Sequence, residues 1–228
     1  MSRIDLYHGA GYVSLVETWG SDERVIESAR MSTDGAFRGW GTPEAPGDER
    51  LLRYLWTHAH HTPFEMAGAI VEIQAPIFVM RQIQRHRAAS YNELSARYTE
   101  MPDTFWMPAP GDLRAQPPGK GQIGTGGIDA TTAECAAALI RRAYLHALAW
   151  YRGLLDLGVS REQARTVLPM GLMTRMRMQC NLRMWCHFLA LRLDPHAQEE
   201  TRAVAAAVAT MLRGAFPRTM ALFDEDRP

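Results

Sequence analysis

The residues best suited to chemistry are concentrated in one stretch, 85–98, which reads Arg-His-Arg-Ala-Ala-Ser-Tyr-Asn-Glu-Leu-Ser-Ala-Arg-Tyr. It contains three arginines, a histidine, a carboxylate, two serine hydroxyls, an amide and two phenols. Its few apolar residues follow neither a helical nor a two-residue period, so packing alone does not explain the composition. We therefore interpret the stretch as the anion-binding centre of an enzyme.

Other polar residues also interrupt the apolar pattern of their surroundings. They lie at Gln82, at Arg165, between 181 and 187, and at Arg192. Together with the 85–98 stretch they supply six arginines, at positions 85, 87, 97, 165, 183 and 192. Six guanidinium groups repel one another and are costly to desolvate, so they are either solvated separately or meet phosphates. Lys120 is the only lysine in the chain, so arginine is the usual basic residue here. A single arginine is therefore weak evidence of function, and the whole stretch is stronger evidence.

Two other kinds of chemistry receive little support. His58, His60 and His61 could converge on a metal at a helix end, but no second set of ligands with suitable spacing follows them. We expect no metal and interpret the three histidines as a polar helix terminus. The cysteines at 135, 180 and 186 have no recognisable partner base, so we expect reduced thiols, with those at 180 and 186 in the core and no thiol nucleophile.

Hydrophobic periodicity predicts the elements that must position these residues. The strand 69–75 alternates apolar and polar residues, and Pro76 begins a helix, 77–86, that ends at the 85–98 stretch. A strand with one polar face is expected at about 175–179, where methionine alternates with arginine or glutamine. The other expected elements are a strand at 12–16 and helices at 21–32, 47–60, 131–157, 160–169, 181–191 and 194–213.

The chain as a whole indicates one soluble domain spanning 1–228. The segment 111–128 is rich in glycine and proline and lacks an apolar period, so we expect a mobile loop or lid there. The formal net charge of zero argues against nucleic-acid or membrane-surface binding, although an arginine-rich nucleic-acid-binding module remains the alternative to an enzyme. With no signal sequence and no long apolar run, we expect a cytoplasmic protein.

At the 85–98 stretch the sequence resembles the family of flavin-dependent thymidylate synthases, whose signature is Arg-His-Arg-x-x-Ser-x-Asn-Glu-x-Ser-x-Arg-Tyr. All nine specified positions match. The resemblance continues in the segments 60–65, 75–79, 81–82, 164–169, 181–183, 188–192 and 196–200. It therefore covers most of the chain outside 111–128.

The resemblance implies a reductive methylation of dUMP to dTMP, with 5,10-methylenetetrahydrofolate as one-carbon donor, FAD as hydride carrier and NADPH as reductant. It implies no enzyme nucleophile, in agreement with the absence of an activated cysteine. It also implies an α+β fold, a sheet flanked by long helices, and a homotetramer whose active sites are shared between subunits.

Matching positions assign residue roles by resemblance. Ser95 and Arg97 would hold the phosphate of dUMP, and Arg192 would be catalytic, lying beside the uracil and favouring its ionisation at N3. The full set of implied dUMP contacts is Gln82, Arg85, Glu93, Leu94, Ser95, Ala96, Arg97, Arg165 and Arg192. The implied FAD contacts are Thr62, Arg85, His86, Arg87, Glu93, Asn181, Arg183 and His187. The chain departs from many relatives at His61, Met66 and His187, where those proteins have Glu, His and, in some cases, Asn.

Overall fold

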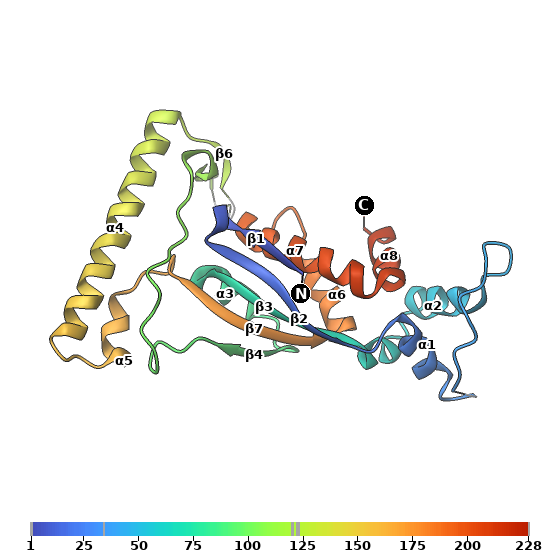
Figure 1. The fold of residues 1–228 in the computed structure, drawn as a ribbon. Helices are drawn as coiled ribbons and strands as arrows, with labels where there is room; N and C mark the ends of the chain where they lie inside the picture. Colours follow the sequence, from blue (N-terminus) through green and yellow to red (C-terminus); the bar gives the residue numbers. More distant parts are fainter. Residues whose placement is uncertain (1, 34, 120, 122–123, 228) are drawn as a thin grey trace.

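The fold is α+β and is built on one antiparallel sheet of five strands (Figure 1). The computed structural model of the chain describes residues 2–33, 35–119, 121 and 124–227. The strands lie in the order β1-β2-β3-β7-β4, so neighbours in the sheet are often distant in sequence. Their bounds are β1 Arg3–Leu6, β2 Gly11–Trp19, β3 Gly68–Pro76, β7 Met173–Asn181 and β4 Ser90–Glu93.

The two central strands, β3 and β7, each have one buried face, as the alternation of their residues predicts. On β3 Val71 and Ile73 are buried, and on β7 Met176 and Met178 are buried. The opposite face is polar, and Arg177 of β7 pairs there with Glu72 of β3. The buried face is covered by α6 Leu182–Arg192 and α7 Glu199–Ala215, and α8 Pro217–Glu225 packs against α7 (Figure 1).

The remaining helices lie at the two ends of the sheet. The helices α1 Asp22–Arg30 and α2 Gly47–Thr57 are at one end, and the long α4 Ala130–Asp156 stands at the other (Figure 1). Short helices α3 Ile77–Ile83 and α5 Arg161–Ala164 follow β3 and α4. A second, smaller apolar cluster, which includes Tyr151 of α4 and Leu172, joins α4 to the rest of the chain. Among the described residues, no helix is both long and apolar enough to cross a membrane.

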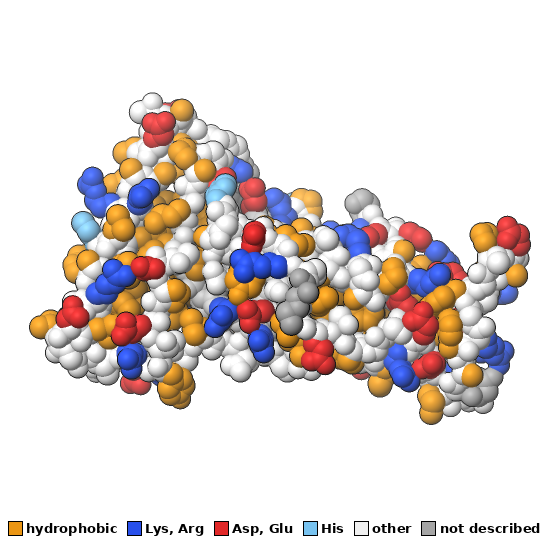
Figure 2. Space-filling view, viewed as in Figure 1, with side chains coloured by type: hydrophobic (Ala, Val, Ile, Leu, Met, Phe, Trp, Pro, Cys, Tyr) orange, Lys and Arg blue, Asp and Glu red, His pale blue; other side chains and the backbone are white. Residues whose placement is uncertain are grey.

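One face of α4 leaves large apolar side chains in contact with solvent. Leu139 and Trp150 are 59% and 63% exposed, and Leu157, directly after the helix, is 82% exposed. Positions 139, 150 and 157 are 11 and 18 residues apart, close to whole numbers of helical turns, so these side chains share one stripe. Figure 2 shows apolar side chains gathered over this end of the molecule.

Several sequence-based predictions need correction. The predicted helix 47–60 ends at Thr57, because Ala59 has a positive φ of 55°. The predicted helix 194–213 begins only at Glu199 and extends to Ala215. Its start is displaced because the Asp194 carboxylate accepts a hydrogen bond from the backbone of His196 at 2.7 Å and forms a turn instead.

Some elements were not predicted, and the long connection contains two short strands. Strand β1, strand β4 and helix α8 lie in segments for which the sequence indicated no separate element. Within 111–128, the short strand β5 Arg114–Ala115 pairs with β6 Thr125–Gly127. The mobility of this connection stays a prediction, and positions 120, 122 and 123 lie outside the described residues.

Candidate active site

The 85–98 stretch divides into three parts that reach two different pockets. Positions 85–89 form the turn after α3, β4 pairs with β7, and positions 94–98 continue beyond β4. Tyr91 fixes the turn, because its hydroxyl donates to the backbone oxygens of Ile83 at 2.9 Å and His86 at 2.8 Å. Burial raises the pKa of Tyr91 to about 12, so the phenol keeps the proton that it donates.

The first pocket has a volume of about 620 Å³ and lies where β4 ends. Of the predicted dUMP contacts, it brings together Glu93, Leu94, Ser95, Ala96, Arg97 and Arg165. Arg97 and Arg165 are exposed, and among the described residues neither forms an ion pair. Two uncompensated guanidinium groups beside a serine hydroxyl form a suitable receptor for a phosphate.

Glu93 lies at the inner edge of this pocket with both carboxylate oxygens engaged. The Thr174 hydroxyl donates to one oxygen at 2.9 Å, and the Gln84 amide donates to the other at 2.9 Å. Thr174 is buried on β7, so the carboxylate is anchored to the central sheet. Sequence reasoning missed both anchors: Thr174 is 81 positions from Glu93, and no local pattern links them.

The second pocket has a volume of about 500 Å³ and lies between the turn after α3 and the start of α6. It brings together most of the predicted FAD contacts, namely Arg85, His86, Arg87, Arg183 and His187, and it also contains Arg192. Arg183 is paired with Glu65 at 2.5 Å. Arg85 and Arg87 are exposed, and neither has an ion-pair partner among the described residues.

His86 and Arg192 are joined inside the second pocket. The Arg192 Nε donates to His86 Nε2 at 2.9 Å, which makes that ring nitrogen an acceptor and places the imidazole proton on Nδ1. Burial, reinforced by the charges of Arg192 and His187, lowers the pKa of His86 to about 4. His86 is therefore neutral at physiological pH and holds the guanidinium of Arg192 in place.

Three predicted contacts lie outside both pockets. Gln82 lies on α3, where its backbone oxygen accepts from Arg192 Nη2 at 2.9 Å. Asn181 caps α6, because its side-chain oxygen accepts from the backbone of Met184 at 2.9 Å. Thr62 is exposed at the start of the 3₁₀ turn Thr62–Met66.

The two pockets lie toward opposite ends of the β4–β7 pair. Thr174 lines the first pocket and Cys180 the second. Six positions of a β-strand separate these residues, which corresponds to about 20 Å. Within one chain, the structure therefore does not bring Arg192 together with Arg97 and Arg165, although the family resemblance implies that all three contact one nucleotide.

A third cavity of about 430 Å³ adjoins the second pocket and shares Arg183, Met184 and His187 with it. Its other walls are largely apolar and include Trp56 and Phe64. No group of three or more His, Cys, Asp or Glu residues in the described part of the chain is arranged to hold a metal ion.

Burial leaves Cys180 and Cys186 poorly suited to act as nucleophiles. Cys180 and Cys186 are buried, and burial raises the pKa of the Cys180 thiol and brings that of Cys186 to about 12. Both therefore remain protonated at neutral pH, where only the thiolate would be reactive. Cys135 is exposed on α4 and lines neither pocket.

Comparisons with known proteins agree with the resemblance in the sequence. The family described as "Thymidylate synthase complementing protein" matches residues 14–218. The chain is 40% identical to a flavin-dependent thymidylate synthase of Thermus thermophilus over 94% of its length and 76% of the relative. It is 39% identical to the corresponding protein of Kosmotoga olearia, over 93% of this chain and 90% of that one.

A solved structure has the same fold. It is the UMP/dUMP methylase PolB from Streptomyces cacaoi, bound with 5-Br UMP. The sequence identity is 33%, the TM-score is 0.84, and the match covers 94% of each chain. A second structure of PolB, bound with 5-Br dUMP, matches with a TM-score of 0.83.

Proposed function

Because this chain belongs to the family of flavin-dependent thymidylate synthases, we propose that its two pockets cooperate in the reductive methylation of dUMP to dTMP. FAD is the flavin, and 5,10-methylenetetrahydrofolate and NADPH are the co-substrates. The similarity to PolB, whose structures contain brominated UMP and dUMP, supports a pyrimidine nucleotide as substrate. We place the reaction in the cytoplasm.

The arrangement of the 85–98 stretch is the observation that carries this proposal. Its last residues line the first pocket, and its first residues line the second. One short segment therefore contributes to both a phosphate receptor and a flavin site. The third cavity leaves room beside the flavin for part of another co-substrate.

In the first pocket, the chain's own residues bind and orient dUMP. Arg97, Arg165 and Ser95 bind the phosphate. Glu93, held by Thr174 and Gln84, presents a fixed carboxylate to the nucleotide. Because the protein anchors this carboxylate before substrate arrives, little ordering is needed on binding.

In the second pocket, the residues fit an anionic flavin nucleotide. Arg85 and Arg87 are cations without ion-pair partners among the described residues, as a pyrophosphate requires. Neutral His86 carries a proton on Nδ1 that it can donate to a flavin acceptor. These residues would hold FAD, which, after reduction by NADPH, would supply the hydride for the reaction. Arg192 stabilises negative charge that develops on the pyrimidine.

The distance between the pockets supports an assembly in which two chains form each active site. Arg192 and Gln82 of one chain then meet Arg97 and Arg165 of another. The exposed apolar stripe on α4 supplies a surface for association. We propose a homotetramer, because two stacked pairs of chains satisfy both contacts with closed symmetry.

A flavin spectrum and an isotope assay test the reaction. The purified protein should bind FAD stoichiometrically and release tritium from 5-labelled dUMP only when both methylenetetrahydrofolate and NADPH are present. A protein that never takes up FAD, or that releases tritium without folate, would contradict the proposed reaction.

Mixing two inactive variants tests the shared site. Arg97→Ala damages the first pocket, and Arg192→Ala damages the second. When the two are dissociated, mixed equally and reassembled, about one quarter of sites combine an intact first pocket with an intact second pocket. Activity should return to that level. If the mixture stays inactive after exchange of subunits is demonstrated, each site lies within one chain.

A further inference from the structure

The side-chain amide of Gln82 is held at both of its ends by residues at the start of α7. The Gln82 Nε2 donates to Gln198 Oε1, and the Thr201 hydroxyl donates to Gln82 Oε1 at 3.0 Å. Gln198 is the residue that precedes α7, and Thr201 lies in the first turn. Neither residue belongs to the pockets described above.

In the structure, the oxygen of the Gln82 amide faces Thr201 and its nitrogen faces Gln198. Thr201 is completely buried, so the oxygen end of the Gln82 amide faces the protein interior. The nitrogen end faces Gln198, which is partly exposed. An amide nitrogen has two hydrogens, and only one of them is used by Gln198. The group that Gln82 retains for a ligand is therefore an N–H donor.

Arg192 adds further hydrogen-bond donors beside Gln82. Its Nη2 donates to the backbone oxygen of Gln82 at 2.9 Å, which places the guanidinium beside the same residue. A guanidinium has no acceptor atoms. A ligand that reaches both side chains must therefore present acceptors to them.

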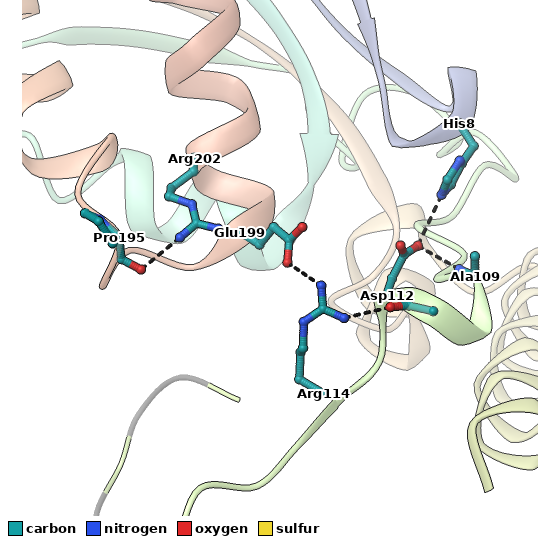
Figure 3. Close-up of polar contacts among 8 residues, drawn as sticks. His8, Ala109, Asp112, Arg114, Pro195, Glu199 and Arg202 are labelled. Carbon is teal, nitrogen blue, oxygen red and sulfur yellow. Dashed lines mark hydrogen bonds and ion pairs between the residues drawn. The ribbon is translucent and has the colours of Figure 1, made fainter. Parts of the chain in front are cut away.

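The first turn of α7 also makes contacts with the segments before it in the sequence. The Tyr7 hydroxyl donates to the backbone oxygen of Glu200 at 2.7 Å. Arg114 pairs with Glu199 at 2.9 Å, and Arg202 donates to the backbone oxygen of Pro195 at 2.8 Å (Figure 3). Figure 3 also shows the segment that carries Arg114 tied to His8 through Asp112.

We propose that Gln198 and Thr201 are positioning residues that fix Gln82 as a hydrogen-bond donor and thereby make the enzyme select uracil over cytosine. The two bases differ at one edge, where uracil carries a carbonyl acceptor and cytosine carries an amino donor. A fixed donor pairs with the carbonyl, whereas it leaves the amino group of cytosine unpaired. Sites built on such hydrogen bonds discriminate strongly against the mismatched ligand. The inference rests on the proposed binding of dUMP.

The first test replaces Thr201. In Thr201→Val the shape is kept but the donor is lost, so the Gln82 amide can rotate and present its oxygen. Thr201→Ser keeps the hydroxyl and is the matched control. Affinities of labelled dUMP and dCMP for the full-length, FAD-loaded protein are measured by equilibrium dialysis, which does not depend on catalysis.

The preference for dUMP over dCMP should fall about tenfold in Thr201→Val, corresponding to about 1.4 kcal/mol, and should be retained in Thr201→Ser. Bound FAD should be unchanged in both variants. If Thr201→Val keeps the preference of the unmodified protein, the inference is wrong. A purely structural role would lower thermal stability and affinity for both nucleotides alike, and that outcome also overturns it.

The second test replaces Gln198 and applies even if Thr201→Val does not fold. Gln198→Glu keeps an acceptor for the Gln82 N–H, whereas Gln198→Leu removes it. The preference for dUMP should fall only in Gln198→Leu. If the unmodified protein binds neither FAD nor dUMP, the proposed function fails. If it binds both and these variants keep its preference, only the present inference fails.

Discussion

At the scale of single residues, the chemistry depends on how Arg192 is held. Two of its nitrogens donate to fixed acceptors, His86 Nε2 and the backbone oxygen of Gln82. Burial lowers the pKa of Arg192, which indicates that its charge is partly removed from water. A cation held in this way needs little reorganisation when negative charge develops on a substrate.

Replacing Arg192 by alanine should therefore affect turnover more than flavin binding. We expect kcat to fall by about 10²–10³-fold, the size of effect seen when one oxyanion-stabilising donor is removed. FAD content should remain near one per chain, because Arg85, Arg87 and Arg183 are unchanged. Steady-state kinetics and the flavin absorbance of the same preparation provide the comparison. Equal losses of FAD and activity would place Arg192 in flavin binding instead.

The neutral state of His86 predicts a pH dependence of stability. Its pKa is about 4 in the folded protein against about 6.5 in an unfolded chain. Between these values the unfolded chain binds more protons, so the contribution of His86 is complete above about pH 6.5 and is lost progressively toward pH 4.

This contribution can be isolated with His86→Gln, which keeps an acceptor near Arg192 but does not titrate. Urea unfolding at pH 6.5, 5.5 and about 4.5 should show a smaller loss of stability in the variant than in the unmodified protein. Identical pH slopes for the two proteins would mean that folding does not lower the pKa of His86.

Sequence reasoning succeeded for residues with a local pattern and failed for residues joined only by the fold. The 85–98 stretch was recognised as a polar block, but its division between two pockets depends on β4, a four-residue strand inside that block. A strand of this length is too short to show a hydrophobic period. It is recognised in the structure by its pairing with β7. The partners of Gln82 are likewise 116 and 119 positions away.

At the scale of elements, β3 and β7 form the support to which the pockets are attached. They pair over nine residues without interruption, and Gly68 begins that pairing opposite Asn181. A Cβ at Gly68 would lie 2.2 Å from the Trp19 ring and 2.6 Å from the backbone oxygen of Cys180. The strands therefore approach too closely for any side chain at this position.

Gly68→Ala should destabilise the fold by about 1–3 kcal/mol, because overpacking forces the backbone to move. Gly153→Ala is the matched control: Gly153 lies within α4, and nothing is within 4 Å of its added Cβ. That change should stabilise the protein by about 0.5–1 kcal/mol through helix propensity. The urea denaturation midpoint should therefore fall in Gly68→Ala and rise in Gly153→Ala. A stable Gly68→Ala protein would refute the close approach.

Element boundaries were predictable where a cap is local. Ser21 and Asn181 cap α1 and α6, and both stand at the first position of a helix predicted from the sequence. The beginning of α7 was misplaced because Asp194 is also a good cap residue, yet its side chain closes a turn instead of starting a helix. A local sequence pattern does not show whether an aspartate caps a helix or closes a turn.

At the scale of the whole molecule, the exposed stripe on α4 indicates association between chains. Three large apolar residues, Leu139, Trp150 and Leu157, lie along one side of this element and are more than half exposed. An apolar surface of this kind is stabilised when a partner covers it. Sequence periodicity predicted the helix, but only the tertiary structure distinguishes the face it buries from the face it leaves exposed.

Trp150→Glu should weaken assembly, because burying an unpaired carboxylate at an interface is costly. We expect a smaller species by analytical ultracentrifugation, together with a matching loss of activity. Arg141→Glu is the control, since Arg141 is also exposed on α4 but lies off the apolar stripe. If Trp150→Glu retains both its assembly and its activity, α4 is not the contact surface.

The length of β7 has one further consequence. In the proposed assembly, the pocket at one end of this strand serves one active site, while the pocket at its other end serves a neighbouring site. A shift of β7 by a single residue would turn every side chain to the opposite face. A substitution at one position of this strand would therefore affect two active sites at once. We expect natural variation to be tolerated least there.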